Sequence, residues 1–272
     1  MKNDSFSPNL QEKKTKFKLN PNIEHNPFLE NQLKQLEMQF IATKKRLENK
    51  FKAKKFIVYF QSFTNTYAPL STLKALYEKA LSFDDVIGLS IGTRTDCVTD
   101  EILDFLYEKS KQKEIWIEYG IQSFFQTTLD KINRADDVEN MRYWIRRTKE
   151  KGLNVCGHLI YGLPDENQEM MLETFKQTID LKVDSIKFHP LYVVKNTLLT
   201  NEFKKGRFTP ISEDLYIDTV VKSIINLPQN VLVQRVTAGI DDDTLLSPLW
   251  CKNKHQQMKN IRVALEEKGF IY

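Results

Sequence analysis

Cysteine is scarce in this chain, whose 272 residues contain Cys97, Cys156 and Cys251 and no other cysteine. These three lie far apart and form no CxxC or CxxxCxxC pattern, so their spacing predicts neither a disulfide framework nor a metal site. We therefore interpret them as small buried hydrophobic residues and predict no metal ligand among them.

Long apolar runs are also missing. No stretch approaches the ~18 consecutive apolar residues that read as a transmembrane helix, and the polar, Lys-rich N-terminus has no apolar core of a signal peptide. We expect a cytoplasmic protein that does not enter a membrane. The sequence also lacks the glycine-rich fingerprint of dinucleotide-binding folds, which argues against that class.

Charge is distributed unevenly, although the formal net charge is only +4. Residues 1–55 contain 13 Lys and Arg against 6 Asp and Glu, and the remaining residues contain 27 against 30. A basic segment beside a slightly acidic body suits a polyanionic partner such as RNA. A solvated basic helix gives the same counts and is the simpler interpretation of charge alone.

The N-terminal segment, residues 1–28, is predicted to be an irregular basic arm, because prolines interrupt a stretch rich in Asn and Lys. Residues 29–50 have apolar side chains at helical spacing and predict an amphipathic helix. The run at 56–60 consists entirely of residues that favour β-structure, which predicts a buried parallel strand.

Strands and helices then alternate along the chain. Strands are expected at 56–60, 86–90, 115–122, 153–161, 185–189 and 231–235, and helices at 70–82, 100–109, 125–151, 167–180, 212–225 and 254–268. Ser71 is predicted to cap the first of these helices. This alternation implies an α/β fold with a parallel sheet and right-handed crossovers. The number and spacing of the units favour an incomplete TIM-like β/α barrel over an open doubly wound sheet.

The central unit of this pattern is the segment 155–166, an apolar strand that ends in a Gly-Leu-Pro turn before a helix. Gly157 and Gly162 have no Cβ atom, so another backbone or a flat ligand can approach closely there. An ordinary turn between a strand and a helix has the same sequence features.

Polar side chains follow the predicted strands, at the edge where β/α barrels carry their chemistry. They are Gln61, Thr64, Asn65, Arg94, Asp96, Glu118, Gln122, His158 and His189. Glu118 is the strongest candidate, because a carboxylate inside an apolar run is costly unless it has a partner or a ligand. Arg94 and Asp96 can pair with each other, and His158 fits a core residue and a site residue equally well.

Several motifs, taken in order, resemble those of one known family. They are YFQSFTNTYA at 59–68, IGTRTDC at 91–97, EYGIQS at 118–123, INR at 132–134, HLIYGLP at 158–164, KFHPL at 187–191 and PLWC at 248–251. On these motifs, residues 55–272 resemble an uncharacterised radical S-adenosylmethionine (SAM) family related to the catalytic-subunit branch of elongator.

The resemblance implies a 4Fe-4S cluster on a cysteine loop after the first barrel strand, with SAM bound at its open iron. Reductive cleavage of SAM would give a 5′-deoxyadenosyl radical that removes hydrogen from the substrate. The residues implied for SAM are Thr64 and Asn65 at the amino group, Ser90, Arg94, Glu118 and Gln122 near the ribose and carboxylate, and the backbone of Ile160 and Gly162 at the adenine. No catalytic residue is implied.

The chain departs from the family at its N-terminus, where Met1 stands at about the position of the last cluster cysteine. We therefore expect an N-terminally truncated chain that lacks the first strand and the cluster ligands. The predicted domains are the arm at 1–28 and a partial radical SAM barrel at 29–272, with a C-terminal extension from about residue 195 to residue 272.

Two functions from different classes follow from this resemblance. The first is a radical SAM enzyme that acts on a tRNA base, such as the side chain of a wobble uridine, by analogy with the elongator branch. The alternative is a degenerate, non-enzymatic barrel that retains SAM or RNA binding. A third, weaker interpretation is a metal-independent lyase that uses Lys187 as a Schiff base. The sequence predicts no oligomeric state.

Overall fold

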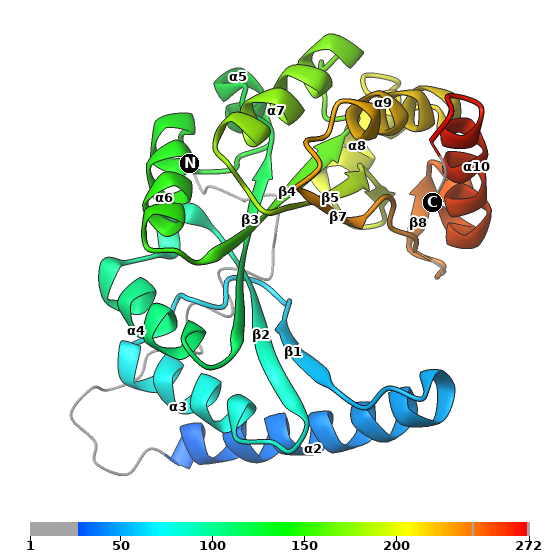
Figure 1. Ribbon diagram of the computed structural model, residues 1–272. Coiled ribbons are helices and arrows are strands. Elements are labelled where there is room, and N and C mark those ends of the chain that lie inside the picture. The colour runs from blue at the N-terminus through cyan, green and yellow to red at the C-terminus, as the bar shows by residue number, and fades with distance from the viewer. Residues whose placement is uncertain (1–26, 241, 271–272) are drawn as a thin grey trace. The chain divides into compact units, whose positions relative to one another are not determined.

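The computed structural model describes residues 27–240 and 242–270 (Figure 1). Most of the predicted arm lies outside these residues, and its last two residues already belong to helix α2 (Pro27–Phe51). The described residues divide into two compact units. The N-terminal unit comprises residues 27–119 and 147–155, and the C-terminal unit comprises residues 120–146 and 156–270. The prediction of one arm and one barrel domain stays a prediction.

The N-terminal unit begins with α2 and continues with alternating strands and helices. They are β1 (Phe56–Phe60), α3 (Leu70–Leu81), β2 (Val86–Thr93), the 3₁₀ helix η1 (Thr95–Cys97), α4 (Asp100–Ser110) and the first part of β3 (Glu114–Gln122). Strands β1, β2 and β3 pair in parallel. Each predicted strand and helix of this unit is therefore confirmed, with small differences at its ends.

Strand β1 differs from its prediction in burial. We expected a buried strand, but Phe56 is its one buried residue and Ile57 is 40% exposed. The reason is its position, because among the described strands β1 pairs with β2 alone and so forms an edge of the sheet. Helix α2 packs against its start, where the Phe40 ring lies 6.2 Å from that of Phe56 and stacks on Phe83 at 4.4 Å.

Helix starts in this unit follow local chemistry. Thr99 caps α4 by accepting a hydrogen bond from the Ile102 backbone N–H, and two acidic residues follow in the first turn. The predicted cap at Ser71 is wrong, because α3 begins one residue earlier. Pro69 is the N-cap residue, and its carbonyl accepts from the Thr72 and Leu73 backbone.

The C-terminal unit repeats the pattern from the end of β3 onward. Its principal elements are α5 (Gln126–Lys131), α6 (Val138–Glu150, in this unit up to residue 146), β4 (Asn154–Tyr161, in this unit from residue 156), α7 (Gln168–Asp180), β5 (Ser185–Pro190), α9 (Glu213–Ile225), β7 (Leu232–Arg235) and α10 (Lys254–Glu266). Strand β4 pairs in parallel with β5, and β5 pairs in parallel with β7. These elements match the predicted ones.

Shorter elements of this unit had not been predicted. Strands β6 (Val193–Val194) and β8 (Leu245–Ser247) form a small antiparallel pair, and α8 (Leu198–Lys204) and the 3₁₀ helix η2 (Leu249–Lys252) flank it. They escape a sequence pattern because two or three residues do not establish a period, and because β6 and β8 are about 50 residues apart in the chain.

The strand order in the main sheet is β1-β2-β3-β4-β5-β7, which is the order of these strands along the chain. A doubly wound sheet reverses its order at a switch point, whereas a β/α barrel adds each strand beside the preceding one. The order therefore supports the barrel class over the doubly wound class. None of the described helices has the length and apolar character needed to cross a membrane.

Candidate functional site

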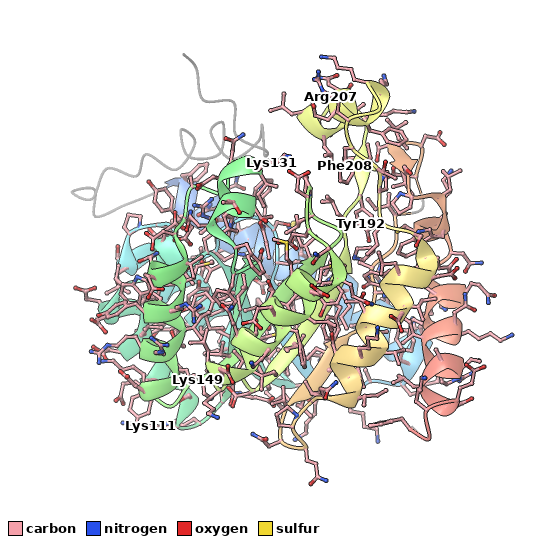
Figure 2. All side chains as sticks on the ribbon, turned by 90° about the horizontal axis from the view of Figure 1, so that it is seen from above. Lys111, Lys131, Lys149, Tyr192, Arg207 and Phe208 are labelled. Carbon is pink, nitrogen blue, oxygen red and sulfur yellow. The ribbon has the colours of Figure 1, made fainter. Side chains whose placement is uncertain are left out.

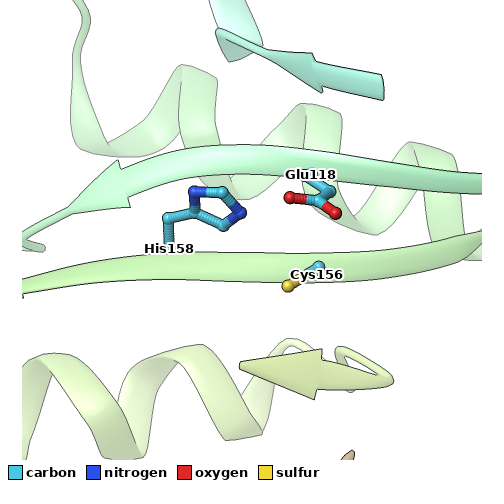
Figure 3. A group of neighbouring side chains, drawn as sticks. All are labelled: Glu118, Cys156 and His158. Atoms are coloured by element: carbon cyan, nitrogen blue, oxygen red, sulfur yellow. The ribbon is translucent and has the colours of Figure 1, made fainter. Parts of the chain in front are cut away.

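Glu118 is the centre of a buried hydrogen-bond network in the N-terminal unit. Its side chain lies on β3 (Figure 3) and is only 2% exposed. The Tyr59 hydroxyl donates to its Oε2 atom at 2.7 Å, and the Ser90 hydroxyl donates to its Oε1 atom. The expectation that this carboxylate needs partners is confirmed. Three neighbouring strands supply the network, one residue each.

Asn65 ties the loop after β1 to the end of β2. Its Nδ2 atom donates to the Phe60 carbonyl at 2.9 Å and to the Gly92 carbonyl at 2.8 Å. The Tyr77 hydroxyl donates to its backbone carbonyl at 2.6 Å. Both Nδ2 hydrogens are thus used, so Oδ1 is the side-chain atom that Asn65 can offer to a ligand. An acceptor of this kind suits an ammonium group.

Asn65→Ala is expected to lower the free energy of unfolding by about 2 to 3 kcal/mol, because two part-buried backbone carbonyls lose their side-chain donor. Urea denaturation measures this difference. Ser62→Ala, an exposed change in the same loop, should stay within about 0.5 kcal/mol of the wild type. Equal effects of the two substitutions would contradict the role assigned to the Asn65 amide.

A cavity of about 620 Å³ opens beside this loop, within the N-terminal unit. Helix α2 and strand β1 form its apolar walls, while Thr64, Asn65, Arg94 and Cys97 contribute polar atoms. Its size is in the range of small-molecule sites. Arg94 is held by Asp96 through two contacts, Nε to Oδ1 at 2.7 Å and Nη2 to Oδ2 at 2.5 Å, as the sequence suggested.

Of the eight residues implied for SAM, five lie in the N-terminal unit, namely Thr64, Asn65, Ser90, Arg94 and Glu118. The structure brings three of them to one cavity and joins the other two by a hydrogen bond. Gln122, Ile160 and Gly162 lie in the C-terminal unit. Gln122 ends β3 in a left-handed conformation with φ 68°.

The two glycines of the central segment lie close to side chains of other elements. A Cβ atom at Gly162, where φ is +89°, would lie 2.7 Å from Cγ2 of Ile211. A Cβ atom at Gly157 would lie 2.9 Å from Cγ2 of Thr178. Protein side chains therefore lie against both glycines, and the approach of a flat ligand to them stays a prediction.

His189 and Arg235 form a second polar group, in the C-terminal unit. Arg235 Nη1 contacts His189 Nε2, and the His189 ring stacks with that of His158 at 6.4 Å. His158 and Cys156 project from β4 (Figure 3). Burial, followed by the charges of Arg235 and other basic groups, lowers the pKa of His189 to about 3.

His189→Gln should make stability less dependent on pH. Because the folded pKa of about 3 lies below the unfolded value near 6.5, the unfolded chain binds the proton first as the pH falls. The wild type therefore loses stability between pH 6.5 and pH 3, by up to about 1.4 kcal/mol per pH unit. Urea denaturation at pH 7, 5.5 and 4 should give a steeper loss for the wild type than for the variant.

The control for this experiment is His255→Gln, which changes an exposed histidine of α10. Its loss of stability with falling pH should parallel that of the wild type. If His189→Gln also followed the wild type over this range, burial of a neutral His189 would be contradicted.

The three cysteines do not fit an iron–sulfur cluster. Cys156 and Cys251 are fully buried in the C-terminal unit, and burial raises the pKa of the Cys251 thiol to about 12. Cys97 belongs to the other unit, where it is half-buried and its Sγ lies 3.4 Å from Asp96 Oδ1. Cluster ligands are thiolates that converge on one centre. The prediction of small buried residues is confirmed for Cys156 and Cys251 and wrong for Cys97.

Sequence reasoning missed Tyr59 and Arg235 as residues of the two polar groups. Tyr59 lies in a predicted strand, where an aromatic residue is expected simply to pack. Its contact with Glu118 spans 59 positions of the chain, so no local pattern indicates it. Arg235 is the last residue of its strand, and a polar residue at such a position is the signal that could have drawn attention to it.

Two profiles of known protein families match this chain. The profile of the radical SAM superfamily matches residues 31–178, and the profile of the radical SAM C-terminal domain matches residues 183–267. The uncharacterized protein YtqA of Bacillus subtilis (strain 168) is 36% identical over 242 residues, which cover 89% of this chain and 75% of YtqA. A tRNA uridine(34) acetyltransferase of Methanocaldococcus jannaschii is 29% identical over 158 residues, covering 57% of this chain and 28% of that protein.

Among solved structures, the archaeal Methanocaldococcus infernus Elp3 with an N-terminal deletion matches with a TM-score of 0.74 and 21% sequence identity. The match covers 87% of this chain, which spans 60% of the Elp3 chain. At this identity the match concerns the fold. It confirms the predicted class, an α/β fold with a partial TIM-like barrel of parallel strands.

Proposed function

Because this chain belongs to the radical SAM superfamily, we propose that it binds SAM through its N-terminal unit, with Glu118 holding the ribose. The observation that carries the proposal is the buried Glu118 carboxylate. Its Oε2 atom accepts a hydrogen bond from Tyr59, and its Oε1 atom accepts one from Ser90. A carboxylate is an acceptor with about four lone-pair sites, which is the chemistry that suits the hydroxyl groups of a ribose.

The cavity beside the loop after β1, which Tyr59 also lines, supplies groups for the amino-acid end of SAM. Asn65 Oδ1 and the Thr64 hydroxyl would accept from the ammonium group, and Arg94 would place a positive charge near the carboxylate. The resemblance also assigns Gln122, Ile160 and Gly162 of the C-terminal unit to SAM, and these three assignments stay a prediction. Members of this superfamily use SAM with a 4Fe-4S cluster, and since the cysteines of this chain do not fit that cluster, we assign no step of radical chemistry to these residues.

Isothermal titration with SAM tests the proposal. The expected result is saturable binding at one site per chain, with S-adenosylhomocysteine binding as well, because the groups named above contact the parts that the two molecules share. Absence of any saturable heat at millimolar SAM would refute SAM binding by this chain. A chain that binds SAM and releases no 5′-deoxyadenosine would instead match the non-enzymatic alternative.

The substrate that we propose is tRNA. A base of the tRNA would be the group that is modified. Two observations support it. The relatives include a protein named for tRNA uridine(34), and the C-terminal unit carries an exposed basic segment around α8. Lys204, Lys205 and Arg207 are exposed there, next to the half-buried Phe208 (Figure 2). The hydrogen bond from Arg207 lowers the pKa of Glu202 in α8, and the charges of Arg207, Lys205 and Lys131 act in the same direction.

Lys205→Gln combined with Arg207→Gln is expected to weaken tRNA binding about tenfold near 0.1 M salt, because each lost phosphate contact lowers affinity and reduces the salt dependence. Gel-shift titrations at several salt concentrations measure both effects. Lys111→Gln combined with Lys149→Gln removes the same charge from the other unit (Figure 2) and serves as the control. Equal losses for the two double variants would contradict a specific role of this segment.

A further inference from the structure

We propose that Arg235, His189 and Tyr192, together with Lys254 at the start of α10, bind an oxyanion, that is a carboxylate or a phosphate group. All four residues belong to the C-terminal unit. The statement that this oxyanion belongs to the substrate rests on the proposed function. Binding of the oxyanion itself does not depend on SAM or on a cluster.

The position of Arg235 is set by an irregularity in the sheet. Strand β7 pairs with β5 so that Val233 lies opposite Ile186 and Arg235 lies opposite Lys187, with a register shift between them. The extra residue, Gln234, donates to the Ser185 hydroxyl at 2.9 Å. A bulge of this kind re-aims the following side chain, and here the Arg235 side chain reaches the His189 ring.

The partner of Arg235 in this contact is a neutral ring. A guanidinium group has donors and no acceptor, so Nε2 of His189 must accept and can carry no proton. After burial, the interactions that lower the pKa of His189 are those with Arg235, His158, Lys187 and Lys254. A permanently charged Arg among basic neighbours attracts an anion, and the fork of its remaining N–H groups matches two oxygens of a carboxylate or phosphate.

Tyr192 adds a hydroxyl group that is ready to donate. Within the part of the chain that the structure describes, its buried Oη atom has no hydrogen-bond partner. Tyr192 follows β5, which pairs in parallel with β7, and β7 ends at Arg235, so the two residues lie at the same edge of the sheet. A buried hydroxyl without a partner carries an unfavourable desolvation cost, and an oxygen of a bound anion would remove it.

Lys254 occupies the first turn of α10, where its charge is unfavourable without an anion. The positive end of a helix dipole favours acidic residues, but this first turn contains none. Gly239, four residues after β7, lies close to the helix start, because a Cβ atom at Gly239 would lie only 3.0 Å from Cβ of Lys254. Gln257 also links Thr237, two residues after β7, to the Trp250 carbonyl. An anion near Arg235 would thus meet the charge of Lys254 as well.

Thermal unfolding of the whole chain, without SAM, measures this binding. Inorganic phosphate and acetate are titrated separately, each with sodium chloride of equal ionic strength as the reference. The anion whose effect on Tm saturates at the lower concentration is the preferred oxyanion. We expect a saturable rise in Tm for at least one of them. If neither phosphate nor acetate raised Tm by more than chloride does, the proposal would be overturned.

Two variants and one control locate the binding. Arg235→Gln is expected to weaken the apparent affinity at least tenfold, and Tyr192→Phe, which removes only the hydroxyl oxygen, by about threefold to tenfold. Arg262→Gln makes the same change at an exposed arginine that pairs with Glu266, and its affinity should equal that of the wild type. Should Arg235→Gln fail to fold, unchanged affinity in Tyr192→Phe would still refute the site. SAM is absent from these titrations. Their result is therefore independent of the result of the SAM-binding test.

Discussion

Glu118→Gln is expected to weaken SAM binding about 100-fold, or about 2.7 kcal/mol, if this carboxylate holds the ribose hydroxyls. Hydrogen bonds to a charged acceptor are worth about 1.5 to 3 kcal/mol each. The amide has the shape of the carboxylate, but it is neutral and only one of its two terminal atoms accepts. Isothermal titration of both proteins with SAM gives the ratio of the two dissociation constants.

The control for Glu118→Gln is Glu114→Gln, which makes the same change four residues earlier on β3. Glu114 is exposed and accepts from the Trp116 indole N–H at 2.6 Å, so its substitution should leave SAM affinity within about twofold of the wild type. Thermal unfolding of Glu118→Gln separates loss of the site from loss of the fold. A variant that folds and binds SAM as tightly as the wild type would exclude Glu118 from the site.

Gly88→Ala is expected to lower the free energy of unfolding by at least about 3 kcal/mol, which is more than the loss expected for Asn65→Ala. A Cβ atom at Gly88 would lie 2.1 Å from the backbone carbonyl oxygen of Glu114. Gly88 pairs with Glu114 where β2 meets β3, so neither backbone can yield without loss of strand pairing. Overpacking usually costs about 1 to 3 kcal/mol, and a contact with backbone lies at the upper end or beyond.

Gly206→Ala provides the matched comparison. This glycine has φ +69° and a Cβ atom there would meet nothing within 4 Å, so only the backbone conformation is penalised, by about 1 kcal/mol. Urea denaturation of both variants should therefore rank Gly88→Ala well below Gly206→Ala in stability. The reverse order would show that the β2–β3 pairing adapts to a side chain at position 88.

Much of the architecture could be predicted from local pattern. Apolar runs of β-forming residues and helical spacing of Leu, Ile and Met place nearly every long element within a few residues, because periods of 2 and 3.6 are properties of short segments. The burial of β1 could not be predicted in this way. The same five apolar residues fit a central strand and an edge strand, and which one they form depends on how many neighbours pair with them.

The candidate site could be predicted in part. Glu118 was identified because a carboxylate in an apolar run requires a partner, and the structure supplies Tyr59 and Ser90. The pairing of Arg94 with Asp96 was evident because the two residues are neighbours in the chain. The contact of Arg235 with His189 was not evident from the sequence. It depends on a bulge in the pairing of β5 with β7, and the two residues are 46 positions apart in the chain.

The sequence by itself determined the alternation of strands and helices, the barrel class and the family resemblance. These features are encoded in local spacing and in motifs that can be recognised without coordinates. Only the tertiary structure decided that Ile211 and Thr178 lie against Gly162 and Gly157, and that a neutral histidine, a tyrosine hydroxyl and basic side chains gather beside β7. The physical reason is that burial, desolvation and charge interactions depend on distances in space, which strand pairing sets between residues far apart in the chain.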